Sequence, residues 1–227
     1  MERKEVHYQG LALEYREKGE NPSWLIYSGT HGDEAGVISS IETVLSSEEK
    51  NFPSFLWVPM VSPSAVANGT RNNARGVNVN RDFFDHSTEP EVQANISLIR
   101  GKVFEYFIDI HEDPSTELFY LYDSWNIPDN PMMQHLFRTI QNTGVGLYDG
   151  IDDPDDSFLG YPVRNGYVSM ADDETYRMQE TGSTTSYLAY HGMVTKRLVT
   201  LEIPGKVSQE KKDAIVAACF DYFLTIR

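Results

Sequence analysis

The sequence predicts an α/β layered fold. Segments with an extended pattern alternate along the chain with segments of helical periodicity, which is typical of a sheet covered by helices. The 227 residues are enough for one α/β domain with a substantial core. We find no internal repeat and no long linker rich in Gly, Ser or Pro, so we expect a single domain over residues 1–227.

The elements follow from local patterning. Short apolar runs typical of buried strands lie at residues 24–27, 55–60, 103–110, 118–122 and 197–203, and residues 6–17 indicate edge strands or a hairpin. Helical periodicity covers residues 33–45, 90–102, 131–142, 183–190 and 207–226, the second of these opening with a proline. Residues 61–86 and 149–182 are expected to be polar surface segments.

Composition excludes several classes of partner. The formal net charge of −15 argues against a nucleic-acid binder, which usually presents a basic face, and against adhesion to anionic lipid. The first residues lack the apolar region of a signal peptide, and no apolar run is long enough to span a bilayer. The single cysteine, Cys219, lies in an apolar helical pattern and is interpreted as core packing. We therefore expect a cytoplasmic protein without nucleic-acid or membrane partners.

A first pair of candidate metal ligands follows the strand at residues 24–27. His31 and Glu34 are three residues apart at the start of the next helix, so they share one face and can hold the same ion. The spacing alone is weak, because His86 and Glu89 reproduce it. The second pair follows polar residues and precedes a helix that begins with proline, where a capping role is favoured. Position after a buried strand therefore favours His31 and Glu34.

A third candidate ligand, His111, ends the strand at residues 103–110. It is expected at the same sheet edge as His31, where open α/β folds build their sites. Alone it could be an ordinary loop histidine, but with His31 and Glu34 it completes three protein ligands, the pattern of catalytic zinc. Asp109 and Glu112 are candidates to orient an imidazole, and strand alternation favours Asp109.

Two further features indicate catalysis. The loop at residues 68–84 concentrates Arg71, Arg75, Arg81 and several asparagines in a very acidic chain, and guanidinium groups suit carboxylates and developing oxyanions. Glu202 lies in an apolar strand pattern, where a carboxylate is unusual. A general base beside a metal would explain it, and an edge-strand ion pair is the alternative.

Together these motifs resemble the zinc carboxypeptidase superfamily, which includes the succinylglutamate desuccinylase and aspartoacylase branch. The matching segments occur in the family's order between residues 22 and 206: HGDE at 31–34, NGTR at 68–71, GVNVNRDF at 76–83, DIH at 109–111 and LEIPG at 201–205. The third segment, with Arg71 upstream, is similar to that of bacterial murein-peptide and γ-glutamyl carboxypeptidases.

The resemblance implies a three-layer α/β/α sandwich with a mixed, mostly parallel sheet, and a role for each matching residue. His31, Glu34 and His111 would hold one Zn²⁺, and Glu202 would be the general base. Arg71 would polarise the scissile carbonyl, and Asn80 with Arg81 would hold the terminal carboxylate of the substrate. The mobile tyrosine of pancreatic-type members has no convincing counterpart here, so Tyr176 and Tyr187 are both candidates for substrate contact.

Three functions remain open at this stage. The first is a metallocarboxypeptidase that trims peptides or murein-type peptides, and the second is a zinc-dependent N-acyl amino acid deacylase. The third is a metal-binding protein without catalysis, which is disfavoured because no ligand and no catalytic glutamate is missing. The substrate, the metal loaded in the cell and the oligomeric state do not follow from the sequence.

Overall fold

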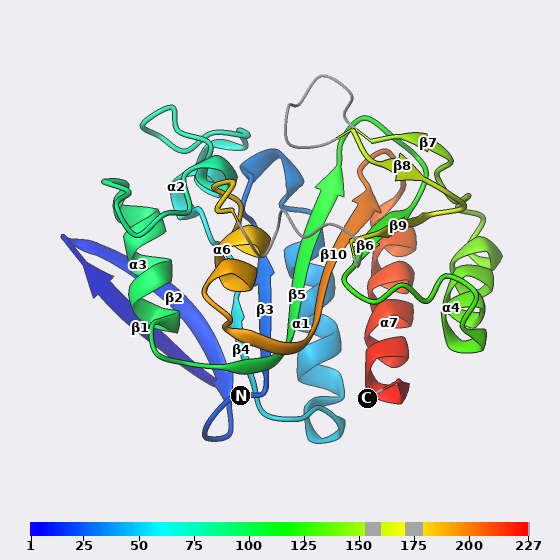
Figure 1. Cartoon of the computed structure of the whole chain (residues 1–227), viewed down its shortest axis with the longest axis horizontal. Helices are drawn as coiled ribbons and strands as arrows, with labels where there is room; N and C mark the ends of the chain where they lie inside the picture. The colour runs from blue at the N-terminus through cyan, green and yellow to red at the C-terminus, as the bar shows by residue number, and fades with distance from the viewer. Residues whose placement is uncertain (153–159, 171–178, 227) are drawn as a thin grey trace.

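A computed structural model describes residues 1–152, 160–170 and 179–226, and its centre is a mixed eight-stranded sheet (Figure 1). The strands run in the order β1-β2-β4-β3-β5-β10-β6-β9. Their bounds are β1 (Glu2–Tyr8), β2 (Leu11–Lys18), β3 (Trp24–Ser28), β4 (Phe55–Val58), β5 (Phe104–Asp113), β6 (Tyr120–Asp123), β9 (Tyr167–Ser169) and β10 (Val194–Pro204). A separate two-stranded ribbon pairs β7 (Gly150–Ile151) with β8 (Pro162–Val163). The central strands β4, β3, β5 and β10 are parallel.

Helices cover both faces of this sheet. The described helices are α1 (Val37–Ser47), α2 (Pro63–Asn68), α3 (Pro90–Ile99), α4 (Pro131–Asn142), α6 (Thr184–Tyr190) and α7 (Gln209–Thr225), with the 3₁₀ turns η1 (Gly32–Glu34), η2 (Glu49–Asn51) and η3 (Val79–Arg81). One apolar core lies between the sheet and α1, α4 and α7, and a second lies between the sheet and α3 and α6. Figure 1 shows α3 and α6 in front of the sheet and α1 and α7 behind it. The predicted three-layer α/β/α sandwich is confirmed.

Strand alternation decides which side chains reach the functional face. On β5, Tyr106, Ile108 and Ile110 enter the core beneath α1, α4 and α7. The alternate residues Phe107, Asp109 and His111 face the α3 and α6 side, so the polar end of this strand opens on that side. No helix in the described ranges combines the length and apolar character that a bilayer crossing requires.

The structure departs from the sequence-based expectation in the segment at residues 61–86. This stretch was expected to be a polar loop, but it contains α2 and η3. Pro63 opens α2, and Gly69, with a φ of 63°, closes it by donating its N–H to Ala65 O and Val66 O. The helix expected at residues 33–45 begins later, because residues 32–34 form the separate turn η1. The capping chemistry of Pro63 and Gly69, which polar composition concealed, explains the first difference. At the second, the N–H of Val37, the first residue of α1, donates to Glu112 Oε1 at 2.7 Å, a tertiary contact that local patterning does not reveal.

A buried ion pair connects β10 to β6. The Arg197 guanidinium donates from Nε to Asp123 Oδ1 at 2.8 Å and from Nη2 to Asp123 Oδ2 at 2.6 Å, and both side chains are fully buried. Tyr222 of α7 accepts a further hydrogen bond at 3.0 Å. The bidentate geometry and the third acceptor compensate part of the loss of hydration of the guanidinium, whose Nη1 has no hydrogen-bond partner among the described residues.

We expect Arg197→Met to lower the free energy of unfolding by about 3–5 kcal/mol, because Asp123 would keep a buried charge without its cation. Urea denaturation of the two chains measures the difference. Lys196→Met is the matched control, since Lys196 pairs with Glu105 at 3.0 Å on the exposed surface and should change stability by about 1 kcal/mol or less. Equal effects of the two substitutions would contradict the proposed importance of the buried pair.

Candidate metal centre and substrate cleft

A cleft of about 620 Å³ opens at the carboxyl ends of the central strands. Its floor is a polar patch of the sheet, where β10 lies between β5 and β6. Glu202 of β10 pairs with His111 on one side and Tyr120 on the other, and Thr200 pairs with Asp109 and Tyr122. Its rim carries side chains from η1 and from the segment that contains η3. The cleft therefore collects residues that lie far apart in the sequence.

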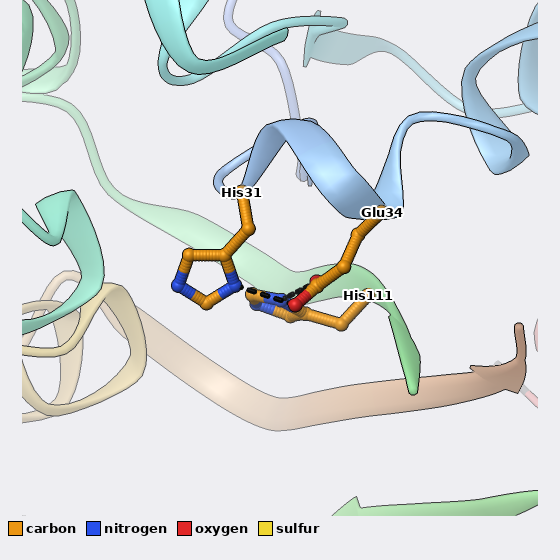
Figure 2. Close-up of side chains that lie close together, drawn as sticks. All are labelled: His31, Glu34 and His111. Atoms are coloured by element: carbon orange, nitrogen blue, oxygen red, sulfur yellow. Dashed lines mark hydrogen bonds and ion pairs between the residues drawn. The ribbon is translucent and has the colours of Figure 1, made fainter. Parts of the chain in front are cut away.

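The three predicted metal ligands meet in this cleft. Glu34 is central, because its Oε1 lies 2.7 Å from His31 Nδ1 and its Oε2 lies 2.7 Å from His111 Nδ1. Figure 2 shows His31 and Glu34 descending from η1 to meet His111 of β5. One donor atom from each residue lies within 4.8 Å of the other two, and all three side chains are buried. Two imidazoles and a carboxylate in this arrangement fit a divalent metal ion with an open coordination position.

Close backbone packing fixes the position of η1. A Cβ atom on Gly32 would lie 1.8 Å from the carbonyl oxygen of Ala65 in α2, so only glycine allows this contact. The Gly32 N–H also donates to Thr70 O at 2.9 Å. The turn that carries His31 and Glu34 is thereby held against α2.

The hydrogen bonds of Asn78 define the tautomer of His31. The Asn80 backbone N–H donates to the Asn78 side chain at 3.0 Å, and a backbone N–H can only donate, so this atom is Oδ1. The same oxygen lies 3.1 Å from His31 Nε2, which must then carry the proton. The lone pair of a neutral His31 is therefore on Nδ1, the nitrogen that faces Glu34 and the candidate metal position.

Neighbouring charges favour the protonated form of His111 and the ionised form of Glu34. Burial lowers the pKa of His111, but the neighbouring Asp109 and Glu34 carboxylates outweigh it and hold the pKa well above its ordinary value. Burial raises the pKa of Glu34, but the two histidines outweigh it and hold that pKa well below its usual range. Without a metal, a proton on His111 takes the place of a cation among these carboxylates.

Glu202 extends from β10 into the cleft beside His111. Burial raises the pKa of its carboxyl group well above the ordinary value, His111 opposes this increase, and Glu34 adds to it. A carboxyl group with a raised pKa next to a metal position is suited to exchanging a proton. The alternative of an edge-strand ion pair is not supported, because β10 lies between β5 and β6.

The predicted substrate-binding residues line the same cleft. Arg71 extends its side chain, 44% exposed, to within 3.3 Å of Glu34 Oε1. Asn80 and Arg81 belong to η3, which begins directly after Asn78. Asn80 Oδ1 accepts from the Thr184 N–H at 3.0 Å, so its opposite atom is an NH₂ donor. Arg71, Asn80 and Arg81 therefore give the cleft wall a set of cationic and amide donors.

The two predicted tyrosines have different outcomes. Tyr187 does not line the cleft, and its prediction as a substrate contact is wrong for this structure. It is 3% exposed, packs against Phe83 at a ring distance of 5.7 Å, and donates to Asp85 Oδ1 at 3.0 Å. The helical turn of α6 directs Tyr187 into the core beneath α3. Tyr176 lies outside the described residues.

Sequence reasoning missed three further residues that line the cleft, which are Tyr120, Tyr122 and Asp152. Tyr120 donates to Asp152 Oδ1 at 3.2 Å and lies 3.1 Å from Asp113 Oδ2, and the Tyr122 hydroxyl contacts Asp152 Oδ2. Burial and the nearby carboxylates raise the pKa of Tyr120, so its hydroxyl keeps its proton. The available signal was the alternation of two tyrosines in YLY, which placed both on one sheet face.

Comparison with known proteins identifies the fold. The sequence is 30% identical to murein peptide amidase A of Vibrio campbellii over 120 residues, which cover 40% of this chain and 48% of that relative. The match therefore spans about half of the relative's length, and no family model matches the chain.

Solved structures align over nearly the whole chain. A candidate metallopeptidase from Shewanella amazonensis aligns with a TM-score of 0.76 and 21% identity, over 99% of this chain and 86% of its own. A metallo-carboxypeptidase from Burkholderia cenocepacia gives 0.65 and 18%, over 99% and 64%. The chain thus has the fold of these metallopeptidases, as the sequence motifs predicted.

Murein peptide amidases are similar to the chain in both comparisons. In addition to the Vibrio sequence, the murein-tripeptide amidase of Escherichia coli O157 aligns with a TM-score of 0.59 and 18% identity, over 99% of this chain and 92% of its own.

The apparent metal affinity should fall as the pH falls. The proton held by His111 must leave before its Nδ1 can bind a metal, so one displaced proton weakens binding by up to about tenfold per pH unit below the His111 pKa. Competition with a chromophoric chelator across a pH series, using Zn²⁺ as the probe, measures the slope. An affinity that does not change with pH would contradict this competition between proton and metal.

Substitution of Gly32 should damage the fold and the metal centre together. Gly32→Ala forces η1 away from α2, with an expected loss of about 1–3 kcal/mol in unfolding free energy and weaker metal binding. Denaturation with a chelator present, followed by metal titration, measures both. Asp33→Ala is the control, because Asp33 lies on the same turn with an exposed side chain and should leave both quantities nearly unchanged.

Proposed function

We propose that this protein is a zinc-dependent metallocarboxypeptidase that hydrolyses the C-terminal amide bond of a peptide or murein-type peptide. One observation carries the proposal: a single cleft brings the His31, Glu34 and His111 donors together with Glu202 and with the Arg71, Asn80 and Arg81 donors. A metal site alone would not distinguish a hydrolase from a storage or structural site. The added carboxylate and the donors for a substrate carboxylate support hydrolysis.

Each residue has a role that its position supports. A zinc ion held by the three ligands would supply Lewis acidity and activate water. Glu202 would take the proton of that water and deliver it to the leaving nitrogen. Arg71 is exposed enough to reorient from Glu34 toward the scissile carbonyl, where it would stabilise developing negative charge. Asn80 and Arg81 would hold the free carboxylate and so select the last residue of the chain.

The size of the cleft supports a peptide substrate. About 620 Å³ lies within the range of pockets that accommodate ligands larger than a single small amino acid. The similarity to murein peptide amidases in sequence and structure supports the same choice. Imidazole and carboxylate donors suit zinc, although such sets also accept cobalt or manganese. Location in the cytoplasm is part of the proposal and rests on the composition of the sequence.

A panel of substrates tests the reaction. Zinc-loaded protein should release the C-terminal residue from free-acid peptides or murein-type peptides. The same peptides with an amidated C-terminus should react about 10–100-fold more slowly, because the carboxylate contacts are lost. Mass spectrometry of the products measures both. Hydrolysis of N-acyl amino acids with none of peptides would overturn the proposal in favour of the deacylase.

Glu202→Gln should separate catalysis from metal binding. The amide cannot act as a base, so kcat should fall by about 10²–10⁴-fold while the zinc affinity stays within a few-fold of the parent chain. Glu117→Gln is the control, because Glu117 is exposed and does not line the cleft. Hydrolysis that survives Glu202→Gln unchanged would favour a metal-binding protein without the proposed catalysis.

A further inference from the structure

The buried residue Thr184 contacts both a neighbour of the candidate metal ligands and a candidate holder of the substrate carboxylate. Its hydroxyl donates to Asp109 Oδ2 at 2.5 Å, and its backbone N–H donates to Asn80 Oδ1 at 3.0 Å. Asp109 lies beside the candidate metal ligand His111, and Asn80 is a candidate holder of the substrate carboxylate. Thr184 itself has no exposed surface, so its position is set by its neighbours.

The contact to Asp109 bears on a buried charge. Asp109 is 1% exposed, and its Oδ2 lies 3.4 Å from His111 Nε2. Within the part of the chain that the structure describes, its Oδ1 has no hydrogen-bond partner, so Oδ2 makes both stabilising contacts. The hydroxyl of Thr184 also lies 3.4 Å from Asn80 Oδ1, but its one proton goes to the nearer and charged acceptor. This hydrogen bond orients the carboxylate that faces the metal ligand.

The contact to Asn80 follows from the start of α6. Thr184 is the first residue of this helix, where backbone N–H groups have no partner within the helix. Ser183, the residue before it, uses its side chain to accept from Ser186 N. The Thr184 N–H remains available and is used by Asn80. Because Asn80 accepts there with its oxygen, its NH₂ group is fixed on the opposite side.

The contacts continue to the other histidine. Asn80 donates its backbone N–H to Asn78 Oδ1, and the same oxygen accepts from His31 Nε2. The Nε2 atoms of His31 and His111, which face away from Glu34, therefore belong to one network. It runs from His31 through Asn78, Asn80, Thr184 and Asp109 to His111. Thr184 is the residue at which its two halves join.

We propose that Thr184 is a positioning residue that couples the metal ligand His111, through Asp109, to the carboxylate-binding Asn80. The inference rests on the proposed function for the role of Asn80, and its main readout is metal affinity, which is independent of the substrate. Partners of metal-ligating histidines typically contribute about 10–100-fold in metal affinity. We expect a contribution of that size from the hydroxyl of Thr184.

The test is a set of variants titrated with Zn²⁺ against a chromophoric chelator. Thr184→Val keeps the shape and the backbone N–H but removes the hydroxyl, and should weaken zinc binding by about 10–100-fold. Thr184→Ser restores the donor and should bind within about threefold of the parent chain. Thr195→Val is the matched control, because the Thr195 hydroxyl bonds Phe104 O on a more exposed part of β10 and should have no effect.

A double-mutant cycle distinguishes a positioning role of Thr184 from a general loss of stability at the site. Asp109→Asn should cause a loss similar to that of Thr184→Val, and adding Thr184→Val to it should cost no more than about a further threefold. With saturating zinc and a peptide substrate, Thr184→Val should lower kcat and leave KM nearly unchanged, because its N–H still holds Asn80.

Circular dichroism with a chelator present verifies the fold of each variant. A folded Thr184→Val chain that binds zinc like the parent overturns the proposal, and so do additive losses in the cycle. If Thr184→Val does not fold, normal zinc binding by Asp109→Asn overturns it equally. If the zinc titrations give the expected losses but the parent chain hydrolyses no peptide, the result counts against the proposed function and not against the role of Thr184.

Discussion

Parallel pairing between β5 and β10 sets Glu202 beside His111 and Thr200 beside Asp109, and the rest of the cleft depends on this register. Successive side chains of a strand point to opposite faces, so a slip of one residue would bury these polar groups among α1, α4 and α7. The apolar alternates Ile108, Ile110, Leu201 and Ile203 hold the register from the other face. Hydrophobic packing on one side of the sheet thus determines the geometry of the candidate site on the other.

Connections at the strand ends complete the site. β3 leads directly into η1, so the residues after its last buried position reach the cleft at the edge where β5 and β10 also end. Gly32 brings η1 against α2, and α2 leads into the segment that contains Arg71, Asn80 and Arg81. The turn with the candidate metal ligands is therefore packed against the helix that leads into the segment with the proposed substrate donors. A change in either is expected to move the other.

The sequence was informative where chemistry coincided with a strand end. His31, Glu34, His111 and Glu202 follow or occupy strongly apolar strands, and the structure brings all four together. Prediction was poorer where tertiary contacts decide the outcome. Tyr187 is a candidate for substrate contact only through the family resemblance, but the helical turn of α6 directs it into the core. Thr184 carried no signal beyond its size and polarity, because its role requires Asp109, Asn80 and a helix start to converge in space.

The two histidines have unequal outer partners, and this difference has an electrostatic consequence. Asn78 fixes the tautomer of His31 without adding charge, whereas Asp109 places a full negative charge beside His111. With Glu34 and Asp109 ionised, a divalent ion would balance their two charges, and Glu202 would be a further carboxylate in the same cleft. An aspartate in place of Asn78 would add negative charge to the same buried site and raise the pKa of Glu202 further. The neutral amide at that position therefore avoids a further increase in the pKa of Glu202, as its proposed role as a general base would require.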